Sequence, residues 1–308
     1  MHRFNMTIPL PQGFAHWQAR LAQSGPSGVF RVTGTGIGRL LRLSGVARYV
    51  EIGMPGKSSP QVEVTIRGGS ASDEEEASRA LKHIFSLDAD LGDFYRHCGS
   101  NEPDMLPLLA ALPGARMIRE ADTFTSVIDS MISQQLNLSF AAELKRRLWS
   151  LCGDAIEVDG AIMRADPTPE AIARIEREQL RALQFSGRKA EYIIDFARRV
   201  ASGDYDVAIL SDMGDEEAIA SLCSVRGIGR WTAECVLLFG LGRQDLLPAG
   251  DVGLLRSASR MWGLPERIGE TELRQRSASW SPWRSWYTYY LWLYDGIRDS
   301  SAGQNVDH

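Results

Sequence analysis

The stretch that decides the fold is Ser224-Val225-Arg226-Gly227-Ile228-Gly229-Arg230-Trp231-Thr232. It lies between two segments with helical patterns, 215–223 and 231–241. Its two glycines predict a tight turn at which the backbone can approach a ligand closely. The free N–H groups and the positive dipole end of the second helix suit a phosphate. A Gly-x-Gly turn alone is weak evidence because glycines end many helices, but its place before an apolar helix strengthens the prediction.

Asp251 follows Trp231 by twenty positions. An aspartate before Val-Gly-Leu-Leu-Arg is a good helix N-cap, and capping by itself explains many such aspartates. Capping would also fix and aim the carboxylate. Near an N-glycosidic bond, a carboxylate held in this way can stabilise an oxocarbenium-like sugar or activate water.

The chain has 308 residues, of which 44% are hydrophobic and 24% charged, which is ordinary for a globular protein of one or two domains. No uninterrupted apolar stretch approaches the roughly 20 residues of a membrane-spanning helix. The N-terminus has only a short apolar run and lacks a convincing signal-peptide pattern. We therefore expect a cytoplasmic protein with no membrane partner.

The four cysteines have separations of 54, 71 and 12 positions, which fit no zinc or iron–sulfur site. They are Cys98, Cys152, Cys223 and Cys235. We expect reduced, mostly structural thiols and no metal held by side chains.

The net charge of −5 argues mildly against nucleic-acid binding as a property of the whole surface. The distribution of charge matters more than the sum. Residues 224–260 carry five arginines against three acidic residues, a local charge of +2 (5 − 3). A local positive surface on an acidic protein can still bind a duplex, with strong salt sensitivity.

The first third of the chain carries short runs rich in Val, Ile, Thr and Tyr between Gly, Pro and Ser clusters, which predicts an antiparallel meander. The predicted strands are 29–35, 40–44, 47–53 and 61–67, followed by a helix over 73–85. From about Pro113 onward, helical patterns predominate. The predicted helices are 122–136, 139–151, 170–183, 189–202, 216–223, 231–241, 252–262, 270–279 and 286–296.

The predicted fold class is therefore α+β and mainly α. Residues 1–112 are expected to form a small antiparallel β domain with a helix. Residues 113–297 are expected to form a helical domain, which can divide into two lobes around an active-site cleft. Residues 298–308 form a polar tail that we expect to be frayed.

Aromatic residues gather near the C-terminus, where residues 280–294 hold eight. Helical spacing predicts that most of them lie in the core. One or two can line a pocket in which a base stacks or a cationic base lies over a ring. Trp231 can likewise be buried under the hairpin or face such a pocket.

Residues 133–137, Ser-Gln-Gln-Leu-Asn, form a polar break in an apolar helical pattern. One interpretation of this break is an ordinary helix end. The alternative is that a polar side chain here enters a duplex and fills the gap left by an extruded base.

With these motifs, the chain resembles the helix-hairpin-helix DNA glycosylases, and within them the 3-methyladenine DNA glycosylase II (AlkA-type) branch. The matching segments are 124–135, 225–233, 247–251 and 282–285, in the order and spacing of the family. Together they span most of positions 114–296. The N-terminal meander resembles the small β domain of the family in architecture only.

The resemblance implies that Asp251 is the catalytic aspartate. It implies a hairpin that binds DNA phosphate, whose backbone carbonyls in this family often hold a cation, here a sodium or potassium ion. The hairpin residues are Val225, Arg226, Gly227, Ile228, Gly229, Arg230 and Thr232.

The resemblance also implies a base pocket and an intercalating wedge. Trp231 and Trp292 fall where relatives place pocket tryptophans. Cys235 stands where the best-known bacterial enzyme has a tyrosine, so we expect a less aromatic pocket with a different specificity. Gln135, followed by Leu136, falls at the wedge position, which is leucine in that enzyme.

The lysines distinguish two subtypes. Relatives that also cut the DNA strand use a hairpin lysine to form a Schiff base. Here Trp231 takes that position, and no lysine follows Lys189. The sequence therefore predicts a monofunctional glycosylase, in which Lys189 is structural or contacts a phosphate.

The function implied is excision of alkylated purines, such as 3-methyladenine and 7-methylguanine, from damaged double-stranded DNA in base excision repair, leaving an abasic site. We expect a monomeric, bacterial-type, nucleoid-associated enzyme. The alternatives are a glycosylase for oxidised or deaminated bases, such as 8-oxoguanine or hypoxanthine, and a non-catalytic protein that binds lesions or distorted DNA.

Overall fold

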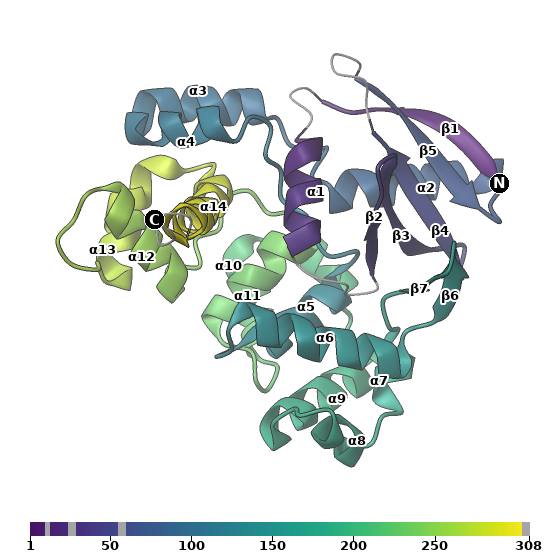
Figure 1. Ribbon diagram of the computed structural model, residues 1–308. Helices are drawn as coiled ribbons and strands as arrows, with labels where there is room; N and C mark the ends of the chain where they lie inside the picture. Colours follow the sequence, from purple (N-terminus) through teal and green to yellow (C-terminus); the bar gives the residue numbers. More distant parts are fainter. Residues whose placement is uncertain (10–12, 24–28, 55–59, 304–308) are drawn as a thin grey trace.

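The computed structural model describes residues 1–9, 13–23, 29–54 and 60–303, and the side chains of these residues up to 294 (Figure 1). Within this part of the chain the fold is mainly helical with a small antiparallel sheet, as the sequence predicts. Figure 1 shows the sheet with α1 and α2 on one side of the molecule and the other helices gathered beside it.

The sheet has five antiparallel strands in the order β1-β5-β4-β3-β2. They are β1 (His2–Thr7), β2 (Phe30–Val32), β3 (Gly36–Leu43), β4 (Val46–Gly53) and β5 (Gln61–Arg67). The alternation of β5 is as predicted, with Val62, Val64 and Ile66 buried. The sequence missed β1, a short edge strand whose six residues pair with β5.

One face of the sheet is covered by two helices, α1 (Phe14–Gln23) and α2 (Glu74–Ile84). The helix predicted over 73–85 is thus confirmed, and its first turn holds three glutamates that favour the positive dipole end. The buried face of α2 packs into one apolar core with the inner residues of the strands and Trp17 of α1. The helix α1 has no counterpart among the helices predicted from the sequence.

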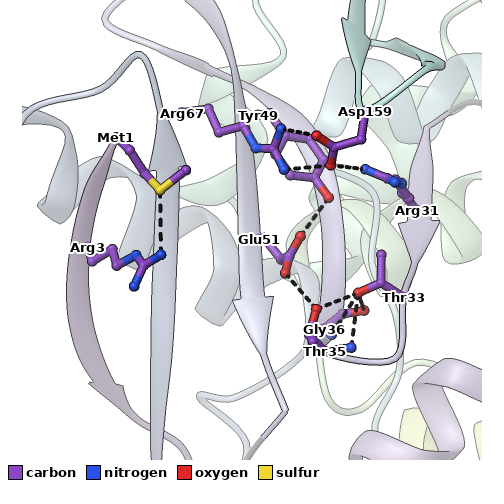
Figure 2. Close-up of polar contacts among 10 residues, drawn as sticks. All are labelled: Met1, Arg3, Arg31, Thr33, Thr35, Gly36, Tyr49, Glu51, Arg67 and Asp159. Atoms are coloured by element: carbon purple, nitrogen blue, oxygen red, sulfur yellow. Dashed lines mark hydrogen bonds and ion pairs between the residues drawn. The ribbon is translucent and has the colours of Figure 1, made fainter.

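The opposite face receives a two-stranded hairpin, β6 (Ala155–Val158) and β7 (Ala161–Arg164), which the sequence also missed. Its turn is Asp159-Gly160, both at positive φ, a pair typical of tight hairpins and a signal that could have revealed it. Figure 2 shows Asp159 bound to two arginines of the sheet, at 2.6 Å from Arg31 and 2.7 Å from Arg67. These ion pairs hold the hairpin against the sheet.

The other helices share one large apolar core. They are α3 (Leu91–Asn101), α4 (Leu106–Ala111), α5 (Thr123–Ser133), α6 (Leu138–Cys152), α7 (Pro169–Ala173), α8 (Arg177–Ala182), α9 (Gly187–Ser202), α10 (Asp215–Cys223), α11 (Arg230–Val236), α12 (Val252–Met261), α13 (Glu270–Arg276) and α14 (Arg284–Gly303).

The helical part of the chain differs from the sequence-based prediction in four respects. The segment 170–183 is broken into α7 and α8, and residues 237–241 continue α11 as a π-helix. The helices α3 and α4, which the sequence-based division placed with the N-terminal sheet, pack in the helical core. The last helix extends to Gly303, so residues 298–303 of the predicted polar tail are helical, and residues 304–308 lie outside the described part.

Among the described residues, no helix has the length and apolar character needed to cross a membrane.

The helix α1 joins the sheet to the C-terminal helix. The indole N–H of Trp17 donates to the carbonyl of Arg116 at 3.1 Å, and the hydroxyl of Tyr289 in α14 donates to the same carbonyl at 3.0 Å. The ring of His16 lies 2.7 Å from that hydroxyl. Burial, and then the nearby charge of Arg20, lowers the pKa of His16 from 6.5 to about 4.

We predict that His16 makes the fold sensitive to acid. Between about pH 6.5 and 4 the unfolded chain binds a proton at this residue and the folded protein does not, so stability falls as the pH is lowered through this window. Thermal unfolding of the wild type and of His16→Phe, followed by circular dichroism across this range, should show a smaller acid-induced loss in the variant. Equal losses in both proteins would contradict the prediction.

Candidate active site and DNA interface

Asp251 caps the N-terminus of α12, as its sequence context predicts. Its Oδ1 accepts the backbone N–H of Leu254 at 2.7 Å and the indole N–H of Trp292 at 3.0 Å. Within the described part of the chain, no hydrogen bond reaches Oδ2. One carboxylate oxygen is therefore fixed by two elements, α12 and α14, and the other keeps its lone pairs for a reacting group.

The segment before Asp251 is anchored by the start of α14. The Ser285 hydroxyl donates to the carbonyl of Arg243 at 2.7 Å and accepts the N–H of Leu246 at 3.0 Å. The guanidinium of Arg284 lies 2.7 Å from the carboxylate of Asp245. The motif at 282–285 thus positions the loop that carries the catalytic candidate.

Trp292 contacts two residues at this site. Besides its hydrogen bond to Asp251, its ring stacks on Phe239 with centroids 5.8 Å apart and an interplanar angle of 14°. The sequence did not single out Phe239, because an aromatic residue in an apolar helix is normally a core residue. Only the packing of the π-helical segment against α14 brings it to Trp292.

Trp231 and Cys235 also lie near Asp251. The Cβ of Trp231 is 3.9 Å from the position that a Cβ would take on Gly250. Cys235 is buried, and burial, followed by the nearby charge of Asp251, raises the pKa of its thiol well above the ordinary value. The structure therefore brings together four residues that were predicted to form one site: Asp251, Trp292, Trp231 and Cys235.

The turn at 225–229 connects α10 and α11, as predicted. Val225 and Ile228 are buried and anchor it to the core. Gly227 has φ +93, and a Cβ there would lie 2.4 Å from the ring of Tyr192 in α9. Only glycine fits this position, both for its backbone conformation and for its contact with α9.

The polar side chains of the hairpin have protein partners. Arg226 pairs with Glu191 of α9 at 2.5 Å and lies over the Tyr192 ring. Arg230 pairs with Glu216 at 2.6 Å and with Glu234 at 3.0 Å. Because Glu191 and Glu216 lie outside 224–260, their ion pairs reduce the local positive charge counted from the sequence.

Thr232 differs from the other hairpin residues in the predicted set. It is 2% exposed, and its Oγ1 accepts a hydrogen bond from Gln134. Its side chain is thus used inside the protein, and the backbone N–H groups at the start of α11 are left as the elements suited to a phosphate.

The predicted wedge lies in a turn between α5 and α6. Gln135 is exposed and has φ +57, a left-handed conformation that is uncommon for glutamine. Leu136, the second residue of the predicted wedge, is partly buried and packs against the core. Leu138, which the sequence analysis did not name, is 86% exposed at the first position of α6.

The turn is held by two polar residues beside it. The side-chain amide of Gln134 donates to the carbonyl of Gly227 and to the hydroxyl of Thr232, each at 2.9 Å. The ammonium of Lys189 donates to the backbone carbonyls of Ile132 and Gln134. Burial lowers the pKa of Lys189 to about 8.

No group of three or more His, Cys, Asp or Glu side chains among the described residues could hold a metal ion. All four cysteines are free.

Comparison with known proteins supports the resemblance found in the sequence. Residues 128–283 match the family described as HhH-GPD superfamily base excision DNA repair protein. A DNA-3-methyladenine glycosylase of Bacillus subtilis is 34% identical over 218 residues, which cover 71% of this chain and 72% of the relative.

Solved structures extend the similarity to the sheet. The 3-methyladenine DNA glycosylase of Archaeoglobus fulgidus superimposes with a TM-score of 0.82 at 25% identity, over 96% of this chain and 99% of that one. The Schizosaccharomyces pombe 3-methyladenine DNA glycosylase, solved with abasic DNA, gives a TM-score of 0.56 at 28% identity over 65% of this chain and 95% of that one.

We predict that Asp251→Asn preserves the fold and that Asp251→Ala does not preserve all of its stability. Asparagine retains an oxygen that can accept the N–H of Leu254, whereas alanine leaves the cap unfilled at a cost of about 1 kcal/mol. Urea unfolding of the two variants measures the difference. Equal stability of the alanine variant and the wild type would show that the cap contributes nothing.

Proposed function

Because the chain belongs to the HhH-GPD superfamily of base excision DNA repair proteins, we propose that it excises alkylated purines of the 3-methyladenine and 7-methylguanine type from double-stranded DNA. Relatives that carry the name DNA-3-methyladenine glycosylase support this substrate class. The reaction is hydrolysis of the N-glycosidic bond, which releases the base and leaves an abasic site.

The observation that carries the proposal is the Asp251 carboxylate, with Oδ1 fixed by two donors and Oδ2 free of hydrogen bonds from described residues. As the bond to the base breaks, positive charge develops on the sugar. A preorganised carboxylate beside that charge stabilises the transition state without reorganisation. Alkylated purines carry a positive charge and leave readily, so a modest site suffices.

The aromatic residues beside Asp251 suit such a base. A cationic ring gains energy over the face of a tryptophan. Phe239 covers one face of Trp292, so a base can stack only on the other face of this tryptophan or on the outer face of Phe239. Cys235, buried and uncharged, supplies a small wall where a larger aromatic residue would narrow the pocket.

We further propose that the turn at 225–229 and the start of α11 bind the DNA backbone while Gln135 enters the duplex. Gln135 is exposed on a turn that contacts the hairpin through its neighbour Gln134. Filling the gap left by the extruded nucleotide offsets part of the unstacking cost. Leu138, three positions after Gln135, is also exposed and can pack against the opened base step.

A sodium or potassium ion on hairpin carbonyls stays a prediction. The carbonyl of Val225 accepts the backbone N–H of Ile228, and the carbonyl of Gly227 accepts the side-chain amide N–H of Gln134. Because a carbonyl oxygen has two lone pairs, each can also face a cation. When bound, such an ion would bridge the turn to a DNA phosphate.

The proposal is tested by incubating the protein with duplexes that each contain one lesion and measuring the released base. We expect release of 3-methyladenine and 7-methylguanine to exceed release of 8-oxoguanine and hypoxanthine. Preferential release of either of the latter bases would favour the alternative glycosylase function. Release of no base from any duplex, with binding retained, would indicate a non-catalytic DNA-binding protein.

Replacing Asp251 by asparagine should abolish excision of 7-methylguanine while binding to abasic-site DNA stays close to that of the wild type. Asparagine retains the cap but lacks the negative charge that stabilises the sugar cation. Single-turnover release and fluorescence anisotropy measure the two properties. Turnover retained in this variant would remove Asp251 from the catalytic role.

We also predict that the enzyme has no strand-cutting activity through a Schiff base. Trp231 takes the hairpin position of the lysine, and the ammonium of Lys189 is bound to the carbonyls of Ile132 and Gln134. Borohydride should therefore trap no covalent complex during excision. A trapped complex that disappears in Lys189→Arg would show that Lys189 acts as a nucleophile after all.

A further inference from the structure

The geometry points to a latch in which Gln134 and Lys189 hold the wedge residue Gln135 in fixed position relative to the phosphate-binding hairpin. The inference rests on the proposed function, because it assigns positioning residues to base flipping. Neither residue is expected to touch the base or the sugar. Both act through Gln135.

Gln134 bridges the two DNA-facing elements. Its backbone belongs to the turn that carries Gln135, while its side-chain amide donates to Gly227 and Thr232 of the hairpin. Both acceptors are in rigid surroundings, since Thr232 is buried and Gly227 packs on Tyr192. The turn therefore cannot move away from the hairpin without breaking two hydrogen bonds.

Lys189 also holds this turn. Its ammonium donates to the carbonyls of Ile132 and Gln134, which lie at the C-terminal end of α5. A cation at this end of a helix is favourable, because the last carbonyls lack helical partners. Ser186 is the N-cap of α9, and its hydroxyl accepts the backbone N–H of Lys189 at 3.2 Å. This hydrogen bond fixes the backbone from which the lysine side chain extends.

The conformation of Gln135 shows why such a latch is needed. A left-handed backbone is unfavourable for glutamine, and it persists only where neighbouring contacts impose it. Gln134, the residue immediately before Gln135, donates to the hairpin through its side chain and accepts from Lys189 through its carbonyl. These contacts keep the exposed side chain of Gln135 projecting from the turn before DNA arrives.

The consequence is a coupling between phosphate binding and flipping. When the hairpin binds the backbone, the depth at which Gln135 enters the duplex is already set by the latch. Small displacements of a positioned group cost large factors in rate, about 100-fold for 1 Å. Loss of the latch should therefore slow flipping and excision much more than it weakens binding.

The test uses the full-length protein and the variants Gln134→Leu, Gln134→Glu, Lys189→Met and Lys189→Arg. Gln134→Glu keeps the size of the side chain but has no donor for Gly227 and Thr232. Lys189→Arg keeps a cationic donor for the two carbonyls. Lys82→Met, which changes an exposed lysine on α2, is the matched control.

We expect Gln134→Leu, Gln134→Glu and Lys189→Met to lower the single-turnover rate of 7-methylguanine release about tenfold, with affinity for undamaged duplex changed less than about threefold. Lys189→Arg should restore most of the rate. Lys82→Met should match the wild type.

A double-mutant cycle with Gln135→Ala separates positioning from general structural damage. If the latch acts through Gln135, adding Gln134→Glu or Lys189→Met to Gln135→Ala should slow the reaction by less than about twofold further. The proposal would be overturned if Gln134→Glu or Lys189→Met slowed the reaction by the same factor with and without Gln135→Ala. It would also be overturned if Lys189→Arg did not restore the rate. If Lys189→Met fails to fold, the cycle with Gln134→Glu still shows whether the latch acts through Gln135.

A fluorescence measurement distinguishes failure of the latch from failure of the proposed excision. A duplex with 2-aminopurine beside an abasic-site analogue reports unstacking whether or not any base is released. We expect the wild type to increase the fluorescence and the latch variants to do so about tenfold more slowly. Equal rates in all proteins would exclude the latch, even if the wild type excises no methylated base.

Discussion

The hydrogen bonds at Oδ1 of Asp251 join the two helices on which the site is built. One comes from the first turn of α12 and the other from the indole of Trp292 in α14. The same indole stacks on Phe239 of the π-helical segment. The carboxylate is therefore held by three elements that share one core, and its position follows from their packing rather than from a flexible loop.

The DNA-facing elements form a second rigid unit. Tyr192 of α9 fills the space left by the missing side chain of Gly227, and Gln134 links the hairpin to the turn of Gln135. The ion pairs of Arg226 and Arg230 turn their charge toward neighbouring carboxylates. Affinity for DNA would then depend more on backbone N–H groups than on arginine charge, which fits an acidic protein.

Most of the helical fold could be predicted from the sequence, as could the local positions of Asp251 and of the glycine turn. The capping pattern placed Asp251 at a helix N-terminus, and the glycines placed the turn between α10 and α11. The edge strand β1, the helices α1, α3 and α4, and the hairpin β6–β7 were missed. These elements are stabilised by packing on segments that are distant in the sequence, which no local sequence pattern reveals.

By itself, the sequence determined the kinds of groups present: a capped carboxylate, a glycine turn, a tryptophan in place of a lysine and a polar break at residues 133–137. The tertiary structure decided which groups meet. It brought Phe239 to Trp292, buried Thr232 and packed Leu136, partly buried, against the core. It also set Gln134 and Lys189 around the wedge turn. Local propensity acts over a few residues, whereas these contacts join segments dozens of positions apart, and only the packing of the whole core fixes them.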